Sequence, residues 1–130
     1  MNKPMPNSHY LRHVHLHVGH VASVKDWYCD ILELAVVFEL PEQLVILTSK
    51  GNCQLGLEAG PPVSEPERVH LIFRVDDVDA VYESLSGRHD VKLRYPPTDQ
   101  PYGHRVMAIQ DPVGHTVELY TPLPGERAYD

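Results

Sequence analysis

Residues 11–18, LRHVHLHV, alternate between polar and apolar side chains, and residues 69–75, VHLIFRV, repeat the pattern further along the chain. Alternation with a period of two predicts a β-strand with one face in the core and the other left for solvent or a site. His13 and His70 lie five residues before the ends of their stretches and 57 residues apart, which predicts an internal repeat. The apolar face of the first stretch holds Val14, Leu16 and Val18, and its polar face holds His13, His15 and His17.

Signals for a helix and three more strands follow each stretch, and residues 60–67, GPPVSEPE, form a linker by composition. We therefore expect an α+β fold in a single domain, residues 1–130, with paired βαβββ modules at 10–59 and 68–123 and a tail at 124–130. Modules of about 50 residues are too small to be stable alone, so they must pack on each other or on a second chain. The expected helices are 24–32, capped by Ser23, and one from Asp76 or Asp77 to Leu85; the expected strands are 35–40, 44–48, 53–58, 91–94, 105–110 and 116–120, with a proline-rich loop at 95–103.

Composition narrows the classes of function. The 130 residues are 42% hydrophobic and 22% charged, which is typical of a globular domain. The net charge of −7 argues against binding to nucleic acid or to an anionic membrane. The sequence contains no apolar run of about 20 residues and no signal peptide at its start, so we expect no membrane partner. Cys29 and Cys53 are interpreted as packed free thiols, and we expect a cytoplasmic protein.

Three side chains on the polar faces of predicted strands form a candidate metal site. His13 and His70 occupy matching positions in the two modules, and Glu118 lies in the last strand. Two imidazoles and one carboxylate can hold one divalent ion and leave positions open for substrate or water. Because the three residues are 57 and 48 positions apart, they form a site only if the fold brings them together.

Three segments together resemble the vicinal oxygen chelate superfamily, over about residues 10–122. They are RHVHLHVGHVASVKDWYCDILEL (12–34), VHLIFRVDDVDAVYESL (69–85) and GHRVMAIQDPVGHTVELYTP (103–122), the last with its Asp-Pro-x-Gly turn. The superfamily includes glyoxalase I, extradiol dioxygenases, fosfomycin-resistance thiol transferases, methylmalonyl-CoA epimerase and bleomycin-resistance proteins. The resemblance places His13, His70 and Glu118 on metal-ligand positions. It implies one divalent ion (Fe²⁺, Mn²⁺, Ni²⁺ or Zn²⁺) in a curved-sheet cleft, often formed across a homodimer.

The resemblance also leaves the reaction open. Gln54 is interpreted as standing where the glyoxalase I pattern has a ligand glutamate, and Ala108 stands where the extradiol pattern has a tyrosine. We rank first a metal-dependent, dioxygenase-like enzyme that acts on a small molecule chelating the ion through vicinal oxygens. The alternatives are a glyoxalase-like lyase or isomerase, a thiol transferase, and a non-enzymatic protein that binds a drug in the cleft.

Further polar and aromatic side chains are candidates for contact with the substrate, although none is assigned a catalytic role. They share a face with a proposed ligand or follow the proline-rich loop, which could act as a lid. These candidates are His15, His17, Gln54, Arg74, Tyr102, His104 and Tyr120. The remaining histidines, His115 and His20 among them, are expected in exposed turns and loops, and Trp27 and Tyr28 are expected in the core.

Overall fold

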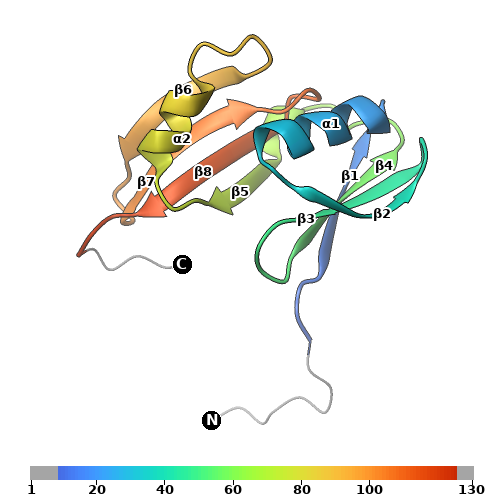
Figure 1. Cartoon of the computed structure of the whole chain (residues 1–130), viewed down its shortest axis with the longest axis horizontal. Helices are drawn as coiled ribbons and strands as arrows, with labels where there is room; N and C mark the ends of the chain where they lie inside the picture. The colour runs from blue at the N-terminus through green and yellow to red at the C-terminus, as the bar shows by residue number, and fades with distance from the viewer. Residues whose placement is uncertain (1–8, 126–130) are drawn as a thin grey trace.

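The computed structural model describes residues 9–125 as two sheets of four strands with one helix each (Figure 1). The first sheet has the order β1-β4-β3-β2 and the second has the order β5-β8-β7-β6. The pairs β1–β4 and β5–β8 are parallel, and the other pairs are antiparallel. The predicted α+β fold of paired βαβββ modules is thereby confirmed. The first half contains β1 (His13–Val18), α1 (Val21–Ile31), β2 (Ala35–Leu40), β3 (Leu44–Thr48) and β4 (Gln54–Ala59); the second contains β5 (His70–Arg74), α2 (Val78–Leu85), β6 (Lys92–Asp99), β7 (His104–Gln110) and β8 (Thr116–Pro122).

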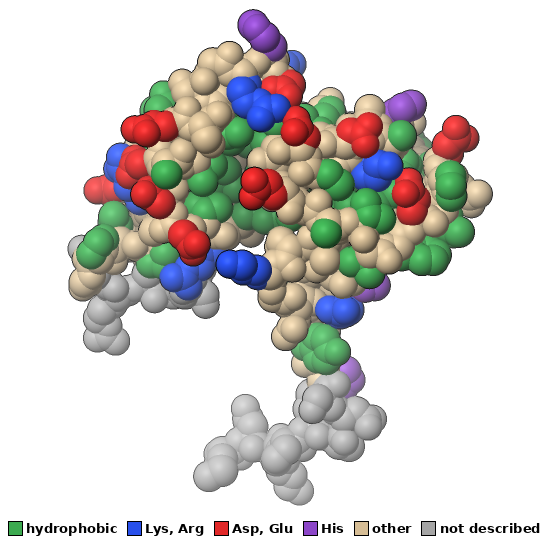
Figure 2. Space-filling model, viewed as in Figure 1, with side chains coloured by type: hydrophobic (Ala, Val, Ile, Leu, Met, Phe, Trp, Pro, Cys, Tyr) green, Lys and Arg blue, Asp and Glu red, His purple; other side chains and the backbone are tan. Residues whose placement is uncertain are grey.

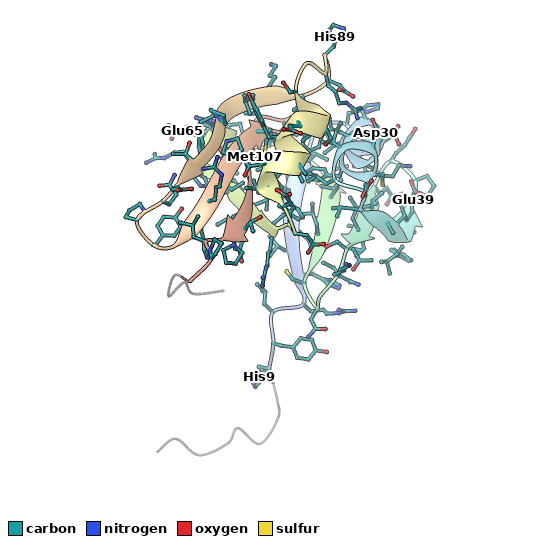
Figure 3. The ribbon with its side chains drawn as sticks, turned by 60° about the vertical axis from the view of Figure 1, so that its left-hand side comes forward. His9, Asp30, Glu39, Glu65, His89 and Met107 are labelled. Carbon is teal, nitrogen blue, oxygen red and sulfur yellow. The ribbon has the colours of Figure 1, made fainter. Side chains whose placement is uncertain are left out.

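A single hydrophobic core spans both halves of the chain. Leu16 and Val18 of β1 lie in this core, as the alternation predicts, because they share the face of the sheet against which α1 packs. Met107 of β7 also lies in this core, on the side of the second sheet that faces α2 (Figure 3). Trp27 of α1 also reaches the second half, where its indole N–H donates a 2.9 Å hydrogen bond to the carbonyl of Asp90. Burial of each large apolar side chain contributes about 1.5–3 kcal/mol, so this shared core holds the two halves together.

The faces of the two sheets that point away from the helices carry the polar residues of the alternating pattern. His13 of β1 is exposed, and His70, Ile72 and Arg74 of β5 are exposed as well. The edge strand β2 is exposed along its whole length, including the apolar side chain of Phe38. The polar faces are therefore accessible in a single chain. On the face of the molecule in Figure 2, acidic side chains are scattered with Lys and Arg among them.

Helix α1 begins earlier than the sequence predicts. The expected cap was Ser23, but the cap is His20, whose ring nitrogen Nδ1 accepts the backbone N–H of Ser23 at 3.2 Å. An imidazole nitrogen can satisfy an unpaired N–H at a helix start as a serine hydroxyl does. His20 is thus part of the helix cap rather than a plain loop residue. Within residues 9–125, neither helix is long and apolar enough to cross a membrane.

Strand β6 continues through much of the stretch that was expected to be a loop. It runs from Lys92 to Asp99 and includes Pro96 and Pro97. Proline is tolerated there because β6 is at the edge of its sheet and its pairing with β7 is irregular around Tyr95. Only residues 100–103 remain as a connection, so the expected lid over residues 95–103 is wrong for most of its length. The expected tail is described only as far as residue 125, and residues 126–130 lie outside the described part.

Candidate functional site

His70 and Glu118 form a close pair on the open face of the second sheet. The parallel pairing of β5 with β8 places Glu118 beside Ile72, one step along the same face from His70. The distance between His70 Nδ1 and Glu118 Oε2 is 2.7 Å, and the His70 side chain is 51% exposed. This contact is a direct hydrogen bond, which keeps the two predicted ligands side by side on the open face of the second sheet.

His13, the third predicted ligand, lies on the first sheet. It is the first residue of β1, its register partner is Gln54 of β4, and its ring stacks on that of His15 at 5.6 Å. Within residues 9–125 of one chain, no three His, Cys, Asp or Glu side chains gather to hold a metal ion. The structure thus brings His70 and Glu118 together and leaves His13 apart from them.

The registers of the two parallel strand pairs change the interpretation of Gln54. His13 pairs with Gln54, and His70 pairs with Thr116. Glu118 lies two residues beyond Thr116, and the residue two beyond Gln54 is Gly56. Gly56 therefore occupies the place in the first module that Glu118 occupies in the second. Gln54 is buried and is the register equivalent of Thr116, so within this chain's own repeat Gly56, and not Gln54, matches Glu118.

Glu58 of β4 lies between two imidazoles of β1. His15 Nδ1 is 2.5 Å from Glu58 Oε1, and His17 Nε2 is 3.3 Å from Glu58 Oε2. The hydrogen bond from His15 is the main reason that the pKa of Glu58 lies below its ordinary value. His15, His17 and Glu58 lie on one face of the sheet because side chains alternate between faces along β1 and β4. This cluster fixes the orientation of His15 on the open face.

The aromatic candidates of the second module also lie together. The rings of His104 and Tyr120 stack at 4.1 Å, with 13° between their planes. The Tyr102 ring meets His104 edge-on at 5.4 Å and is exposed. His104, which the sequence places just after the proline-rich loop, is buried and is the first residue of β7. Arg74 is exposed and is the register partner of Tyr120, so both belong to the same part of the sheet.

A buried hydrogen-bond network involves His115, which the sequence had placed in an exposed turn. His115 is 1% exposed, and its Nδ1 lies 2.6 Å from Asp111 Oδ2. The Tyr28 hydroxyl donates to the same oxygen at 2.6 Å. Asp111 Oδ1 accepts three backbone N–H groups of the turn, from Val113, Gly114 and His115. Because Tyr28 belongs to α1, this network joins the closing turn of the second module to the first module.

Charge and burial oppose each other at Asp111. Burial alone would raise its pKa, but the hydrogen bonds from His115 and Tyr28 outweigh burial and lower the pKa below its ordinary value of 3.8. Burial, and then the Asp111 charge, raise the pKa of the Tyr28 hydroxyl. Both shifts favour an ionised carboxylate that accepts from a protonated phenol.

The stability of the metal-free protein should depend on this carboxylate in acid. A lowered folded-state pKa means that the ionised form contributes fully above pH 3.8, and the contribution is lost as the pH falls through the lower folded value. Urea unfolding between about pH 5 and pH 2 measures the loss, spanning the ordinary aspartate range. The Asp111→Asn variant should lose less stability over that range. An equal loss in both proteins would contradict the assignment.

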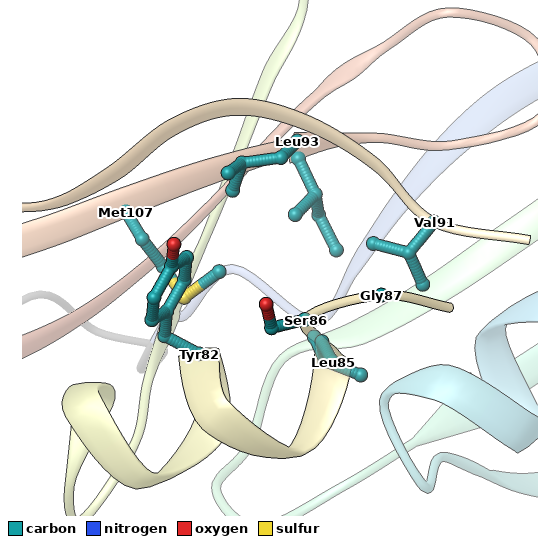
Figure 4. A pocket seen from close by; sticks show the side chains of 8 residues that line it. Tyr82, Leu85, Ser86, Gly87, Val91, Leu93 and Met107 are labelled. Carbon is teal, nitrogen blue, oxygen red and sulfur yellow. The ribbon is translucent and has the colours of Figure 1, made fainter. Parts of the chain in front are cut away.

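The hollow in Figure 4 lies elsewhere, between α2 and the strands β6 and β7. Its volume is about 70 Å³, well below the roughly 300 Å³ of a small ligand pocket. Its lining consists of Tyr82, Leu85, Ser86, Gly87, Val91, Leu93, Met107 and Ile109. None of these is a predicted site residue, and Ser86, Gly87 and Leu93 are exposed, so the hollow is interpreted as a small gap at the surface between α2 and the second sheet.

Comparison with known proteins reveals the family. Residues 10–119 match the model of the glyoxalase/bleomycin resistance protein/dioxygenase superfamily. No curated protein matches the chain. Among solved structures, TnmS3, an antibiotic-binding protein from Streptomyces sp. CB03234, is 27% identical with a TM-score of 0.76, over 92% of this chain and 99% of that one.

Two further structures share the fold at lower identity. A lactoylglutathione lyase from Agrobacterium tumefaciens is 24% identical with a TM-score of 0.67, over 90% of this chain and 96% of that one. A superfamily member from Nocardioides is 17% identical with a TM-score of 0.72, over 97% and 91%. The internal repeat and the closing Asp-Pro-Val-Gly turn of this chain are consistent with the family that the match identifies. The chain belongs to the glyoxalase/bleomycin resistance protein/dioxygenase superfamily.

Proposed function

We propose that two copies of this chain form clefts in which a divalent metal ion activates a small molecule that chelates it through adjacent oxygens. The observation that carries the proposal is the pairing of two predicted ligands, His70 and Glu118, on an accessible sheet face. The distance between His70 Nδ1 and Glu118 Oε2 is 2.7 Å. His13 lies on the corresponding face of the first sheet and is also accessible. The three donors suit an ion with open coordination positions.

A second copy is needed because His13 and the His70–Glu118 pair lie on different sheets. In a dimer with twofold symmetry, the first sheet of one copy can face the second sheet of the other. Each cleft then takes His13 from one chain and the pair from the other. The exposed apolar residues of β2, such as Phe38, and of β5, such as Ile72, are side chains that such a contact would cover.

The donor set fits the metal that the family uses. Two imidazoles with one carboxylate suit Fe²⁺, Zn²⁺, Ni²⁺ or Mn²⁺, and the ion when bound lowers the pKa of a coordinated hydroxyl. Arg74 lies on the same face as His70 and can pair with a negatively charged oxygen of the substrate. Dioxygenase-like chemistry remains our first choice, with lyase, isomerase and thiol-transferase chemistry as alternatives. The free thiols Cys29 and Cys53 suit the reducing cytoplasm, where we place the protein.

Metal analysis tests this proposal directly. Protein purified without added metal should contain a divalent ion or gain thermal stability when Fe²⁺, Mn²⁺, Ni²⁺ or Zn²⁺ is added. His70→Ala and His13→Ala should each lose most of the bound ion. His89→Ala is the control, because His89 lies at the tip of a loop away from the sheet faces (Figure 3). Absence of any ion and of any stabilisation would refute the metal site.

A second candidate function is binding of a small aromatic molecule without chemistry. The relative at 27% identity is called an antibiotic-binding protein, and Tyr102, which is exposed and meets the buried His104 ring edge-on, offers an aromatic side chain to a ligand. A fluorescent aromatic dye such as anilinonaphthalene sulfonate provides the probe. Binding that resists EDTA and His70→Ala but is weakened by Tyr102→Ala would favour this function over the metalloenzyme.

A further inference from the structure

We propose that His15 is a fourth metal donor of the cleft and that Glu58 holds it in the donating orientation. The inference rests on the proposed metal site and deepens it. It adds a donor from the first module, where the sequence had suggested only substrate contact for His15. Three observations carry the inference: the register of β4, the space above Gly56, and the contact between His15 and Glu58.

The internal repeat shows that the first module lacks a carboxylate that the second module has. Glu118 lies on β8 beside His70, and the register places Gly56 at the same point of β4 relative to His13. A glycine leaves the open face of the sheet without a side chain at this point. The first module therefore needs another group if it is to contribute a second donor.

The His15 ring fills the space that Gly56 leaves. His15 is the register partner of Gly56, and a Cβ placed on Gly56 would lie 2.5 Å from His15 Cδ2 and 2.7 Å from His15 Nε2. Non-bonded heavy atoms cannot approach so closely, so any larger residue at position 56 would displace the ring. Gly56 has no positive φ that would require glycine. The glycine thus admits the imidazole to the position where the second module carries its glutamate.

Glu58 determines which nitrogen of His15 is left free to donate. The Glu58 carboxylate accepts from His15 Nδ1, so Nδ1 carries the proton and Nε2 keeps its lone pair. Metal-bound histidines commonly donate their second nitrogen to a carboxylate in this way, which fixes the ring and raises its basicity. The His13 ring stacks beside it, with 20° between the planes. His13 and His15 are therefore adjacent imidazoles on the open face of the first sheet.

The completed set contains three imidazoles and one carboxylate. His13 and His15 come from one copy of the chain, and His70 and Glu118 come from the other. A set richer in nitrogen favours Zn²⁺, Ni²⁺ and Fe²⁺ over Mn²⁺ and Mg²⁺, which prefer oxygen donors. In this proposed set the first module supplies the His15 imidazole above Gly56, where the second module has the Glu118 carboxylate.

Titration of the metal-free dimer with Zn²⁺ and Co²⁺ tests the inference. His15→Ala should weaken affinity by at least about tenfold, and Glu58→Gln should weaken it by about 10–100-fold as the orienting partner. X-ray absorption of the Zn²⁺ form should count three imidazoles in the unaltered protein and two in His15→Ala. His89→Ala is the control for a surface histidine. An unchanged affinity and imidazole count in His15→Ala would overturn the inference.

Position 56 gives a second, independent test. Gly56→Ala should displace the His15 ring and reduce affinity as His15→Ala does, whereas Gly60→Ala should not, because a Cβ there lies 3.4 Å from His17. The double variant His15→Ala with Gly56→Glu should recover affinity and show two imidazoles. A metal affinity that is unchanged in His15→Ala but lost in His70→Ala overturns only the inference. Binding that survives both His13→Ala and His70→Ala overturns the proposed function as well.

Discussion

Replacing Asp111 with alanine is expected to lower the free energy of unfolding by about 3–5 kcal/mol, because several buried donors lose their shared acceptor and each costs about 1–3 kcal/mol. The substitution removes the acceptor for the Tyr28 hydroxyl, for the His115 ring and for three backbone N–H groups. Tyr28 and His115 are almost fully buried, so water cannot replace the lost acceptor without opening the core. Since a domain is stabilised by only about 5–15 kcal/mol, this change should be near the limit of folding.

Urea unfolding of the metal-free protein measures the effect. Tyr28→Phe removes one hydrogen bond and should cost about 1–3 kcal/mol, less than Asp111→Ala. Asp30→Ala is the matched control, because Asp30 pairs with Arg88 on the surface, and such pairs contribute about 0–1 kcal/mol. If Asp111→Ala were no more costly than Asp30→Ala, the network would add nothing to the shared core that holds the two halves together.

The second large effect is recovery of metal binding when two inactive variants are mixed. His13→Ala and His70→Ala should each bind almost no ion as homodimers, because every cleft lacks one ligand. In a mixed dimer, one cleft combines the intact His13 of one chain with the intact His70 of the other. Random exchange of subunits makes half of the dimers mixed, so about a quarter of the original binding capacity should return under twofold symmetry.

Equilibrium dialysis after unfolding and refolding the mixture together measures this recovery. The control mixes His70→Ala with Glu118→Ala, which both damage the same half of the cleft and should recover nothing. Recovery in the first mixture and not in the second requires clefts shared between chains. If neither mixture recovers while the unaltered protein does after the same treatment, each site lies within one chain.

The alternating stretches made the fold predictable from the sequence. A period of two fixes which residues of β1 enter the core, and the same pattern 57 residues later predicts a second module. The Asp-Pro-Val-Gly turn likewise predicts that the aspartate accepts nearby N–H groups, as it does. These features depend on local geometry, which a sequence expresses directly.

Burial of His115 could not be predicted, because it depends on a contact between residues far apart in the sequence. His115 bonds to Asp111, and Asp111 bonds to Tyr28, which lies 83 positions earlier. The carboxylate that turns His115 inward is itself held by Tyr28 of α1. The equivalence of Gly56 with Glu118 was missed for a similar reason. It requires the register between β1 and β4, and a shift of two residues keeps every side chain on the same face. The two prolines of β6 led to the incorrect prediction of a loop, because proline is excluded from the inner strands of a sheet but is tolerated in an edge strand.

The buried network of Tyr28, Asp111 and His115 has a consequence for how such a protein can evolve. None of these three residues belongs to the candidate site, whose donors lie on exposed sheet faces. Exchange of a donor, such as a glutamate for Gly56 or another residue for His15, therefore leaves the attachment between the halves intact. Selection can vary the metal, the substrate or even the presence of chemistry while the same scaffold keeps folding. Structures called a lactoylglutathione lyase and an antibiotic-binding protein share this fold, so one architecture carries different functions.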